Sequence, residues 1–256
     1  KIKGGEDDQD IASTLSNDQH TGMQFDYIIS NPPYGVDWKK DQVAVEKEFD
    51  RGENGRFHQG LPRVSDGQFL FIEHIISKFK SPQDGGSEAV VITNGSPLFT
   101  GDAGQGESEI RRWILEKDYL DALIALPGDL FFNTGIGTYI WILSNKKPAE
   151  RKNKVMLIDA REMKTSLRKN LGSKRYEISD TQAEKILDLY KNFKESKQVK
   201  IFETTQFAYR KITIERAFQR NFKIDEDRLL RFKAEKAYST LSKSRSKDPV
   251  KAEQEI

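Results

Sequence analysis

Two consecutive prolines, Pro32 and Pro33, directly follow a short aromatic and β-branched run from Phe25 to Ser30. The run has the composition of a buried strand, whereas proline lacks the backbone N–H that the interior of a sheet requires. We therefore predict a strand that stops at Ser30 and a rigid turn that begins at Asn31.

The chain after this turn alternates between helical and strand patterns. Apolar residues about 3.6 positions apart predict helices, and short apolar runs bounded by Gly, Pro and Asn predict strands. The predicted helices cover residues 66–79, 108–117, 181–193, with Asp180 as its cap, and 226–241. The predicted strands cover residues 89–93, 120–126, 138–143, 154–159 and 207–214. Residues 35–65 and the tail from Ser242 show no period, and we expect loop there.

This order predicts an α/β fold. Near-continuous apolar strands that alternate with helices are typical of a parallel sheet covered on both faces. The strand at 138–143 follows its predecessor so closely that we expect it to run antiparallel at the edge of the sheet.

Asn31-Pro32-Pro33-Tyr34 stands at the carboxyl end of the first strand, where open α/β sheets place their ligands. The Asn31 amide oxygen and the Pro32 carbonyl could both accept hydrogen bonds from an exocyclic amine, favouring the charge that develops during methyl transfer. Pro33 biases Pro32 towards an extended conformation, which keeps that carbonyl outside any ladder. Tyr34 offers a ring on which an extruded base could stack. The simpler reading is that Asn-Pro-Pro only terminates a strand.

The tetrapeptide resembles motif IV of the amino-group methyltransferases, which act on adenine N6. Flanking segments are similar to the methylation (modification) subunit of type I restriction-modification systems. These segments are Thr14 to Asp18, Phe25 to Trp38, Leu120 to Pro127, Leu130 to Ile136 and Val155 to Glu162.

The resemblance implies an S-adenosylmethionine-dependent adenine-N6 DNA methyltransferase of the cytoplasm. Its catalytic residues would be Asn31, Pro32, Pro33 and Tyr34, with Asn31 also touching the cofactor. The family places a second aromatic residue across the flipped adenine, and Phe131 matches it, with Phe132 as the alternative. Double-stranded DNA, a specificity subunit and a restriction subunit would be its partners in a hetero-oligomer.

Residues 1–30 do not contain the cofactor-binding loop that the resemblance leads us to look for. The family's Gly-rich cofactor loop precedes motif IV, and Ser13 stands where relatives often carry an acidic side chain for the cofactor. We therefore expect the second half of a Rossmann-like methyltransferase sheet, with an antiparallel last strand and a mixed, basic C-terminal extension. Such a fragment would be inactive by itself and would bind S-adenosylmethionine weakly or not at all.

The charge distribution suggests a boundary within the chain. Residues 1–145 hold 13 basic and 23 acidic side chains, a net charge of −10, while residues 146–256 hold 29 and 17, a net charge of +12. Such asymmetry is a hint of nucleic-acid contact. We predict a truncated catalytic domain over 1–145 and an extension for DNA or subunit contact over 146–256.

Within the extension, nine basic and two acidic residues lie between Arg151 and Arg175. A solvated face would explain this run, and so would phosphate contact, for which the candidates are Lys164, Arg168, Lys169, Lys174 and Arg175. Further basic residues, Arg210, Lys211, Arg216, Arg220 and Lys223, could contact DNA or a partner subunit.

Other function classes are weaker or excluded. The chain has no cysteine and no run of about 18 apolar residues, which excludes disulfide scaffolds, thiolate zinc sites and membrane spans. The three histidines are far apart in the sequence, and we expect no metal site. Two alternatives stay open: a non-catalytic DNA- or subunit-binding fragment, and the same chemistry on a protein glutamine or an RNA base.

Overall fold

The computed structural model describes residues 13–132, 134–217, 225–236 and 238. Contacts within the chain separate after Lys211, so that the residues up to Lys211 and those from Ile212 onward form two compact units. The described part of the second unit contains helix α6 (Glu226–Ala234). Within the described residues, no helix combines the length and the apolar character needed to cross a membrane.

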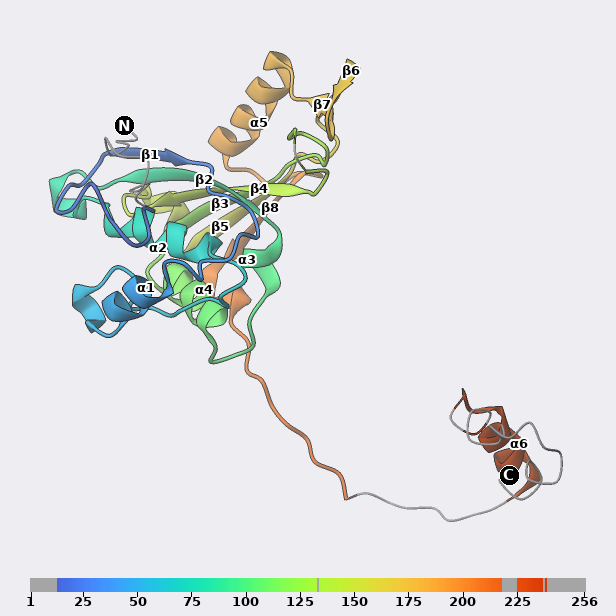
Figure 1. The fold of residues 1–256 in the computed structure, drawn as a ribbon. Coiled ribbons are helices and arrows are strands. Elements are labelled where there is room, and N and C mark those ends of the chain that lie inside the picture. The colour runs from blue at the N-terminus through green and yellow to red at the C-terminus, as the bar shows by residue number, and fades with distance from the viewer. Residues whose placement is uncertain (1–12, 133, 218–224, 237, 239–256) are drawn as a thin grey trace. The chain divides into compact units, whose positions relative to one another are not determined.

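The first unit is built on a six-stranded sheet with the order β1-β2-β4-β3-β5-β8 (Figure 1). Its strands are β1 (Tyr27–Ser30), β2 (Glu88–Asn94), β3 (Leu120–Ala125), β4 (Thr138–Ser144), β5 (Lys154–Asp159) and β8 (Val199–Glu203). β1 pairs with β2 and β3 pairs with β5 in parallel, while β4 is antiparallel to both β2 and β3 and β8 is antiparallel to β5. The predicted α/β fold with a reversed strand is therefore confirmed.

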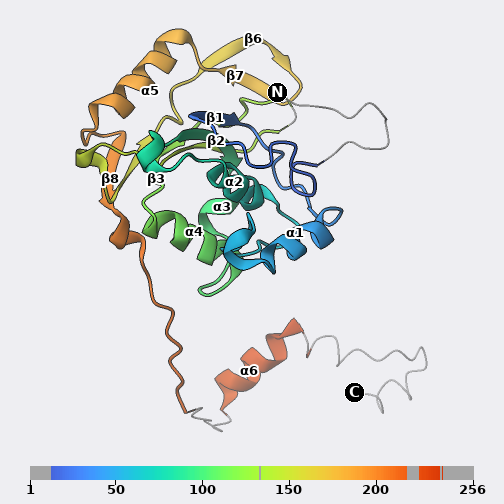
Figure 2. The ribbon, with the colours of Figure 1, turned by 90° about the vertical axis from the view of Figure 1, so that its left-hand side faces the viewer.

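Helices cover both faces of the sheet. They are α1 (Gln42–Phe49), α2 (Gln68–Ser77), α3 (Ser96–Phe99), α4 (Gly106–Glu116) and α5 (Asp180–Asn192), with short 3₁₀ turns at Gly52–Asn54, Pro82–Asp84, Ala149–Arg151 and Thr204–Phe207. Figures 1 and 2 show α5 on one face and α1 to α4 on the other. Each face has its own core: Phe69 and Ile110 pack with Trp141 on the α2 and α4 side, and Ile186 packs with Met156 on the α5 side.

Three details differ from the sequence predictions in the elements up to α5. β4 lies inside the sheet, between β2 and β3, rather than at its edge. Residues 35–65 contain α1, whose single fully buried residue, Val45, gives too little apolar periodicity to reveal a helix. The N-cap of α5 is Ser179, whose hydroxyl accepts from the Gln182 backbone while the Gln182 side chain accepts from the Ser179 N–H. This reciprocal capping box outcompetes Asp180 for the cap position.

The region after α5 also departs from the prediction. The strand lies at Val199–Glu203, whereas residues 208–214, in the range predicted as a strand, have no regular structure. The alternation there comes from exposed side chains, Ile212 being 71% and Ile214 78% exposed, so the pattern marks no buried face. The α6 helix ends at Ala234, and the predicted tail from Ser242 lies outside the described residues.

The charge boundary after Asn145 does not coincide with a boundary of the sheet. β5 and β8 lie beyond it and pair with β3 and with each other. A separate two-stranded hairpin, β6 (Thr165–Leu171) and β7 (Lys174–Glu177), also lies beyond it and was not predicted. Residues 146–211 therefore belong to the same compact unit as Asn31-Pro32-Pro33-Tyr34, called the NPPY motif from here on, whatever their charge.

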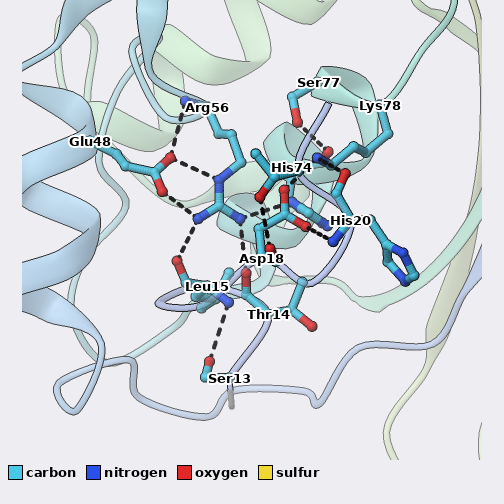
Figure 3. Close-up of polar contacts among 11 residues, drawn as sticks. Ser13, Thr14, Leu15, Asp18, His20, Glu48, Arg56, His74, Ser77 and Lys78 are labelled. Atoms are coloured by element: carbon cyan, nitrogen blue, oxygen red, sulfur yellow. Dashed lines mark hydrogen bonds and ion pairs between the residues drawn. The ribbon is translucent and has the colours of Figure 1, made fainter. Parts of the chain in front are cut away.

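Polar contacts attach residues 13–20 to α1 and α2 (Figure 3). The Arg56 guanidinium donates to both Glu48 oxygens, at 2.8 Å and 2.5 Å, and to the carbonyls of Thr14 and Leu15, each at 2.8 Å. Lys78, which directly follows α2, forms an ion pair with Asp18. These contacts hold the segment that leads into β1, and so they help to position the motif that follows β1.

Candidate active site

The NPPY motif lies at the carboxyl ends of β1, β2, β3 and β5, four strands that run in the same direction. Ser30 pairs with Val91 near the ends of β1 and β2, and Ala125 pairs with Asp159 at the ends of β3 and β5. Asn94, the last residue of β2, faces Thr138, the first residue of β4. Residues that follow β1, β2 and β3 therefore lie together at the carboxyl ends of the strands, which is where open α/β sheets bind their ligands.

The motif is internally hydrogen-bonded. The Tyr34 hydroxyl donates to Asn31 Oδ1 at 2.6 Å, while Pro32 is buried and Pro33 is exposed. Burial raises the pKa of Tyr34 above its ordinary value, and the hydrogen bond to Asn31 opposes this rise in part. The bond orients the Asn31 amide, since it fixes which side-chain atom is the acceptor.

Phe131 lies against Tyr34. The two ring centroids are 5.9 Å apart and the ring planes meet at 77°, an edge-to-face contact. Phe131 is partly buried, whereas Phe132 is 62% exposed. Of the two adjacent phenylalanines, the structure brings Phe131 to the motif.

Backbone hydrogen bonds hold the turn after Tyr34 against the segment that leads into α2. The Gly67 N–H donates to the Val36 carbonyl at 3.1 Å, and the Trp38 N–H donates to the Val64 carbonyl at 3.0 Å. The Trp38 indole N–H donates to the Arg63 carbonyl at 3.0 Å, with the ring buried. Gly35 has a φ of +59°, a conformation that a side chain would strain. The turn is thus rigid, as the prolines predicted.

A largely buried amide network lies beside the turn that follows the motif, where a Cβ added to Gly35 would lie 3.9 Å from Asn94 Nδ2. Gln68 Nε2 donates to Asp66 Oδ1 at 2.9 Å and to Asn94 Oδ1 at 2.9 Å, and the Asn94 N–H donates to Gln68 Oε1 at 2.9 Å. Asp66 also accepts from the Gln68 N–H at 3.2 Å, and the Gln68 side chain links α2 to the end of β2. Asn94 was missed, although an Asn-Gly pair directly after a strand could have identified it.

The β6–β7 hairpin is joined to the loop that carries Phe131. The Ser173 N–H donates to the Phe132 carbonyl at 2.9 Å, and the Arg175 N–H donates to the Asp129 carbonyl at 2.9 Å. Lys174 Nζ lies 5.6 Å from the centre of the Phe132 ring. The hairpin holds all of Arg168, Lys169, Lys174 and Arg175, and Lys164 directly precedes it. The hairpin that carries four of the five candidate DNA-contact residues is thus hydrogen-bonded to the loop that carries Phe131.

Other basic residues of the run have different surroundings. Arg151 is 7% exposed and pairs with Asp121, so it is not available to a phosphate. Arg161 pairs with Asp159 at 2.7 Å. Beyond the run, Lys211 forms an ion pair with Asp102. The run from Arg151 to Arg175 is therefore not one continuous basic face. Arg220 and Lys223 lie outside the described residues.

Ser13 stands where the resemblance leads us to expect an acidic side chain for the cofactor, and its hydroxyl forms hydrogen bonds within the protein. Its hydroxyl donates to Asp41 Oδ2 at 2.9 Å and accepts from the Leu15 N–H at 3.3 Å. Within the described residues, no three His, Asp or Glu side chains lie close enough together to hold a metal ion.

A cavity of about 620 Å³ opens elsewhere, on the α4 face of the sheet. Its lining is mostly apolar and includes Ile114, Leu123 and Leu157, but none of Asn31, Tyr34 or Phe131. Volume alone would point to this cavity, whereas convergent polar and aromatic groups at the strand ends point to the motif. We assign the candidate active site to the motif on that chemistry.

Comparison with known proteins shows the family of this chain. Residues 1–237 match the family model described as N-6 DNA Methylase. The chain is 28% identical over 192 residues to the type I restriction enzyme MjaIX methylase subunit of Methanocaldococcus jannaschii, covering 75% of this chain and 32% of that protein. It is 31% identical over 153 residues to the type I restriction enzyme HindI methylase subunit of Haemophilus influenzae, covering 59% and 31%.

The fold also matches solved structures. The methyltransferase subunit of a type I restriction-modification system from Streptococcus thermophilus superposes with a TM-score of 0.63 and 30% identity, over 76% of this chain and 38% of that one. A modification subunit of a type I restriction enzyme from Vibrio vulnificus shares the fold, with a TM-score of 0.53 and 17% identity over 76% and 37%. The chain spans about a third of the length of the curated relatives it matches. With the family model covering residues 1–237, this chain belongs to the N-6 DNA methylase family.

Proposed function

We propose that this chain carries the target-base site of an S-adenosylmethionine-dependent adenine-N6 DNA methyltransferase, the modification subunit of a type I restriction-modification complex. The contact between Tyr34 and Phe131 beside Asn31 and Pro32 is the observation that carries the proposal. It supplies an aromatic surface and two carbonyl acceptors at one strand end, which is what a planar base with an exocyclic amine needs.

The chain's own residues would bind and orient the adenine. Its ring would stack on Tyr34 and meet Phe131, which requires the edge-to-face contact between the two rings to open. The N6 hydrogens would be accepted by the Asn31 amide oxygen and the Pro32 carbonyl, favouring a pyramidal nitrogen and stabilising the charge that grows on it. Because Tyr34 already donates to Asn31 Oδ1, that oxygen is oriented before the base arrives.

The methyl donor would be S-adenosylmethionine, which supplies an electrophilic methyl group when it is bound. Asn31 is the candidate contact to it among the described residues. We propose that its main binding loop belongs to the two thirds of the relatives' length that this chain does not span. The outer edge of the sheet supports this, because Tyr27 and Ile29 of β1 are 70% and 86% exposed. Within the described residues β1 pairs with a strand on one side only, and an apolar edge strand of this kind is a ready site for another strand to pair.

We propose that the β6–β7 hairpin contacts the DNA backbone near the extruded base. Its basic residues lie on a hairpin that is hydrogen-bonded to the Phe131 loop, at a site where a duplex must pass to deliver a base. Each phosphate neutralised by Lys or Arg releases counterions, so this contact would make binding salt-dependent.

The assembly would be a hetero-oligomer with a specificity subunit that reads the sequence and a restriction subunit that cleaves. The matched relatives are themselves named as methylase subunits of type I restriction enzymes. We propose the same division of labour here.

Incorporation of tritiated methyl groups into plasmid DNA tests the proposal. The full-length protein would be assayed alone and with its specificity subunit. Asn31→Ala should abolish incorporation and Tyr34→Ala should reduce it strongly while DNA binding is retained, and Asn54→Ala, at an exposed asparagine in a 3₁₀ turn, should leave incorporation unchanged.

Three outcomes would contradict it. Unchanged incorporation by Asn31→Ala would exclude this motif as the catalytic site. DNA binding without incorporation by the wild-type complex would favour a non-catalytic fragment. Methylation of protein glutamine or RNA, with DNA left unmodified, would change the acceptor.

A further inference from the structure

Phe132 lies at the tip of a closed turn between β3 and β4. The base of the loop is closed by the Leu126 N–H, which donates to the Thr138 carbonyl at 2.9 Å. Nearer the tip, Phe131 and Thr134 form an antiparallel bridge, which leaves Phe132 in the turn between them. A side chain at such a tip points away from the body of the sheet, and Phe132 is 62% exposed.

The hairpin fixes the backbone of Phe132. The Ser173 N–H bonds to its carbonyl at 2.9 Å, and a Cβ added to Gly172 would lie 2.6 Å from the same carbonyl oxygen. Gly172 also has a φ of +62°, so this close approach depends on glycine for two independent reasons. An exposed phenylalanine is thus held on a braced backbone, which is unlike a side chain that is exposed by chance.

The surroundings of Phe132 indicate the chemistry of its partner. Lys174 Nζ is 5.6 Å from the ring centre, and Arg175 is the next residue of the same strand. A partner that covers this place must offer an apolar surface to the ring and negative charge to the cations. Duplex DNA offers both within a few ångströms, because its stacked bases lie between two phosphate chains.

Position favours DNA over an acidic protein surface. Phe132 directly follows Phe131, whose ring contacts Tyr34 in the candidate active site. Extruding an adenine leaves a gap in the duplex one base thick and costs the stacking of that base. An aromatic side chain next to the base pocket can enter that gap and restore stacking on its neighbours.

We propose that Phe132 enters the base stack in place of the extruded adenine and so stabilises the flipped state. This inference rests on the proposed function and adds a positioning residue to it. Phe131 faces the extruded base and Phe132 fills the space that the base has left.

The test uses the full-length protein with its specificity subunit and two DNA duplexes that contain the target. One is fully paired, and in the other the base opposite the target adenine has been removed, which makes extrusion easy. Phe132→Ala should slow methylation of the paired duplex roughly tenfold, the scale of one lost stacking contact, and change the rate on the second duplex by less than about twofold. Phe132→Trp should restore the paired rate, and Phe49→Ala, at an exposed phenylalanine on α1, should change neither rate.

A fluorescent readout supplements the rates. With 2-aminopurine at the target position, the wild-type complex should raise the fluorescence of the paired duplex by extruding the base, and Phe132→Ala should reduce that rise. Equal losses on both duplexes would show a structural role for Phe132 and overturn the inference alone, as would an unchanged rate on the paired duplex. No methylation of either duplex by the wild-type complex would overturn the proposed function and this inference with it.

Discussion

Arg151 donates a hydrogen bond from Nη1 to Oδ2 of Asp121 at 3.0 Å, and both side chains are less than a tenth exposed. The guanidinium also lies 4.5 Å from the ring centre of Tyr190 and 4.4 Å from that of Phe193. Tyr190 donates from its hydroxyl to the same Asp121 oxygen at 2.6 Å. This group of side chains attaches the end of α5 to β3, so α5 is fixed to the sheet through a buried charge.

Removing Arg151 should therefore destabilise the fold strongly. Arg151→Ala leaves Asp121 as a buried carboxylate without its cation, for which the expected loss is about 3–5 kcal/mol of unfolding free energy. Urea unfolding followed by circular dichroism measures it. Arg161→Ala removes an ion pair whose side chains are 65% and 47% exposed, and it should leave the midpoint nearly unchanged. Equal effects of the two variants would argue against a buried pair.

Stability should fall with acid because of His74. The ring accepts a hydrogen bond from Arg56 Nη1 at 3.0 Å, since a guanidinium can only donate, so the ring is neutral in the fold. Burial first, and the charge of Arg56 second, lower the pKa of His74 to about 4. The unfolded chain thus binds a proton at higher pH than the fold does, and the contribution of His74 is present above pH 6.5 and lost as the pH falls towards 4.

His74→Gln isolates this effect, because the amide oxygen can still accept from Arg56. Between pH 7.5 and 4.5 the wild-type protein should lose roughly 2–3 kcal/mol more than the variant. Unfolding free energies at a series of pH values give the difference. Parallel curves for the two proteins would show that His74 does not titrate as the geometry requires.

Glu73 should have the opposite dependence on pH. It is fully buried in α2, and neither carboxyl oxygen accepts a hydrogen bond of ordinary geometry from the described residues. Burial raises the pKa of Glu73 well above its ordinary value, and the nearby Gln59 N–H opposes this only in part. Its fold-stabilising protonated form is favoured at low pH, and stability is lost as the pH rises above about 4.5.

Glu73→Met should therefore stabilise the protein. Methionine fills a similar volume without an unsatisfied polar group, and a gain of about 1–3 kcal/mol is expected near pH 5. The gain should be larger at pH 8, where the wild-type protein has to hold a proton or a buried charge. Thermal unfolding at both pH values measures it, and a gain that shrinks at pH 8 would contradict the assignment. Glu109→Met, on the partly exposed side of α4, is the control.

Two substitutions of Tyr34 should separate its ring from its hydroxyl. Tyr34→Phe keeps the stacking surface but loses the bond that orients Asn31, and we expect methylation to fall about threefold to tenfold, the scale of one net hydrogen bond. Tyr34→Ala also loses the stack and should fall by roughly a further tenfold or more. Single-turnover methylation by the complete complex is the measurement. Equal activity of the two variants would mean that the ring does not hold the base.

The proposed contact between the β6–β7 hairpin and DNA predicts how DNA binding depends on salt concentration. Lys174→Ala combined with Arg175→Ala should weaken DNA binding and reduce the slope of log K against log salt by about 1–2, since each lost phosphate contact contributes about 0.9. Lys185→Ala, on the exposed side of α5, should leave the slope unchanged. Binding titrations between about 50 and 200 mM salt would show the difference. An unchanged slope in the double variant would place the phosphates elsewhere.

The sequence by itself determined the local elements and the chemistry of the motif. Pro32 and Pro33 ended β1 where predicted, because a residue without an N–H cannot continue a ladder. Apolar periodicity located α2 and α4 within two residues at most ends, since each buries one continuous stripe. The NPPY motif could be assigned a chemistry because its four residues are adjacent in the chain.

Tertiary structure alone decided which distant residues meet. β4 enters between β2 and β3, and this order follows from pairing energies across the whole sheet, which no local pattern records. The choice of Phe131 over Phe132, the link from Gln68 to Asn94, and the bonds that bring the basic hairpin to the Phe131 loop are contacts between separate segments. Charge counting likewise could not show that Arg151 is buried against Asp121, because burial depends on what folds over a side chain and not on its neighbours in sequence.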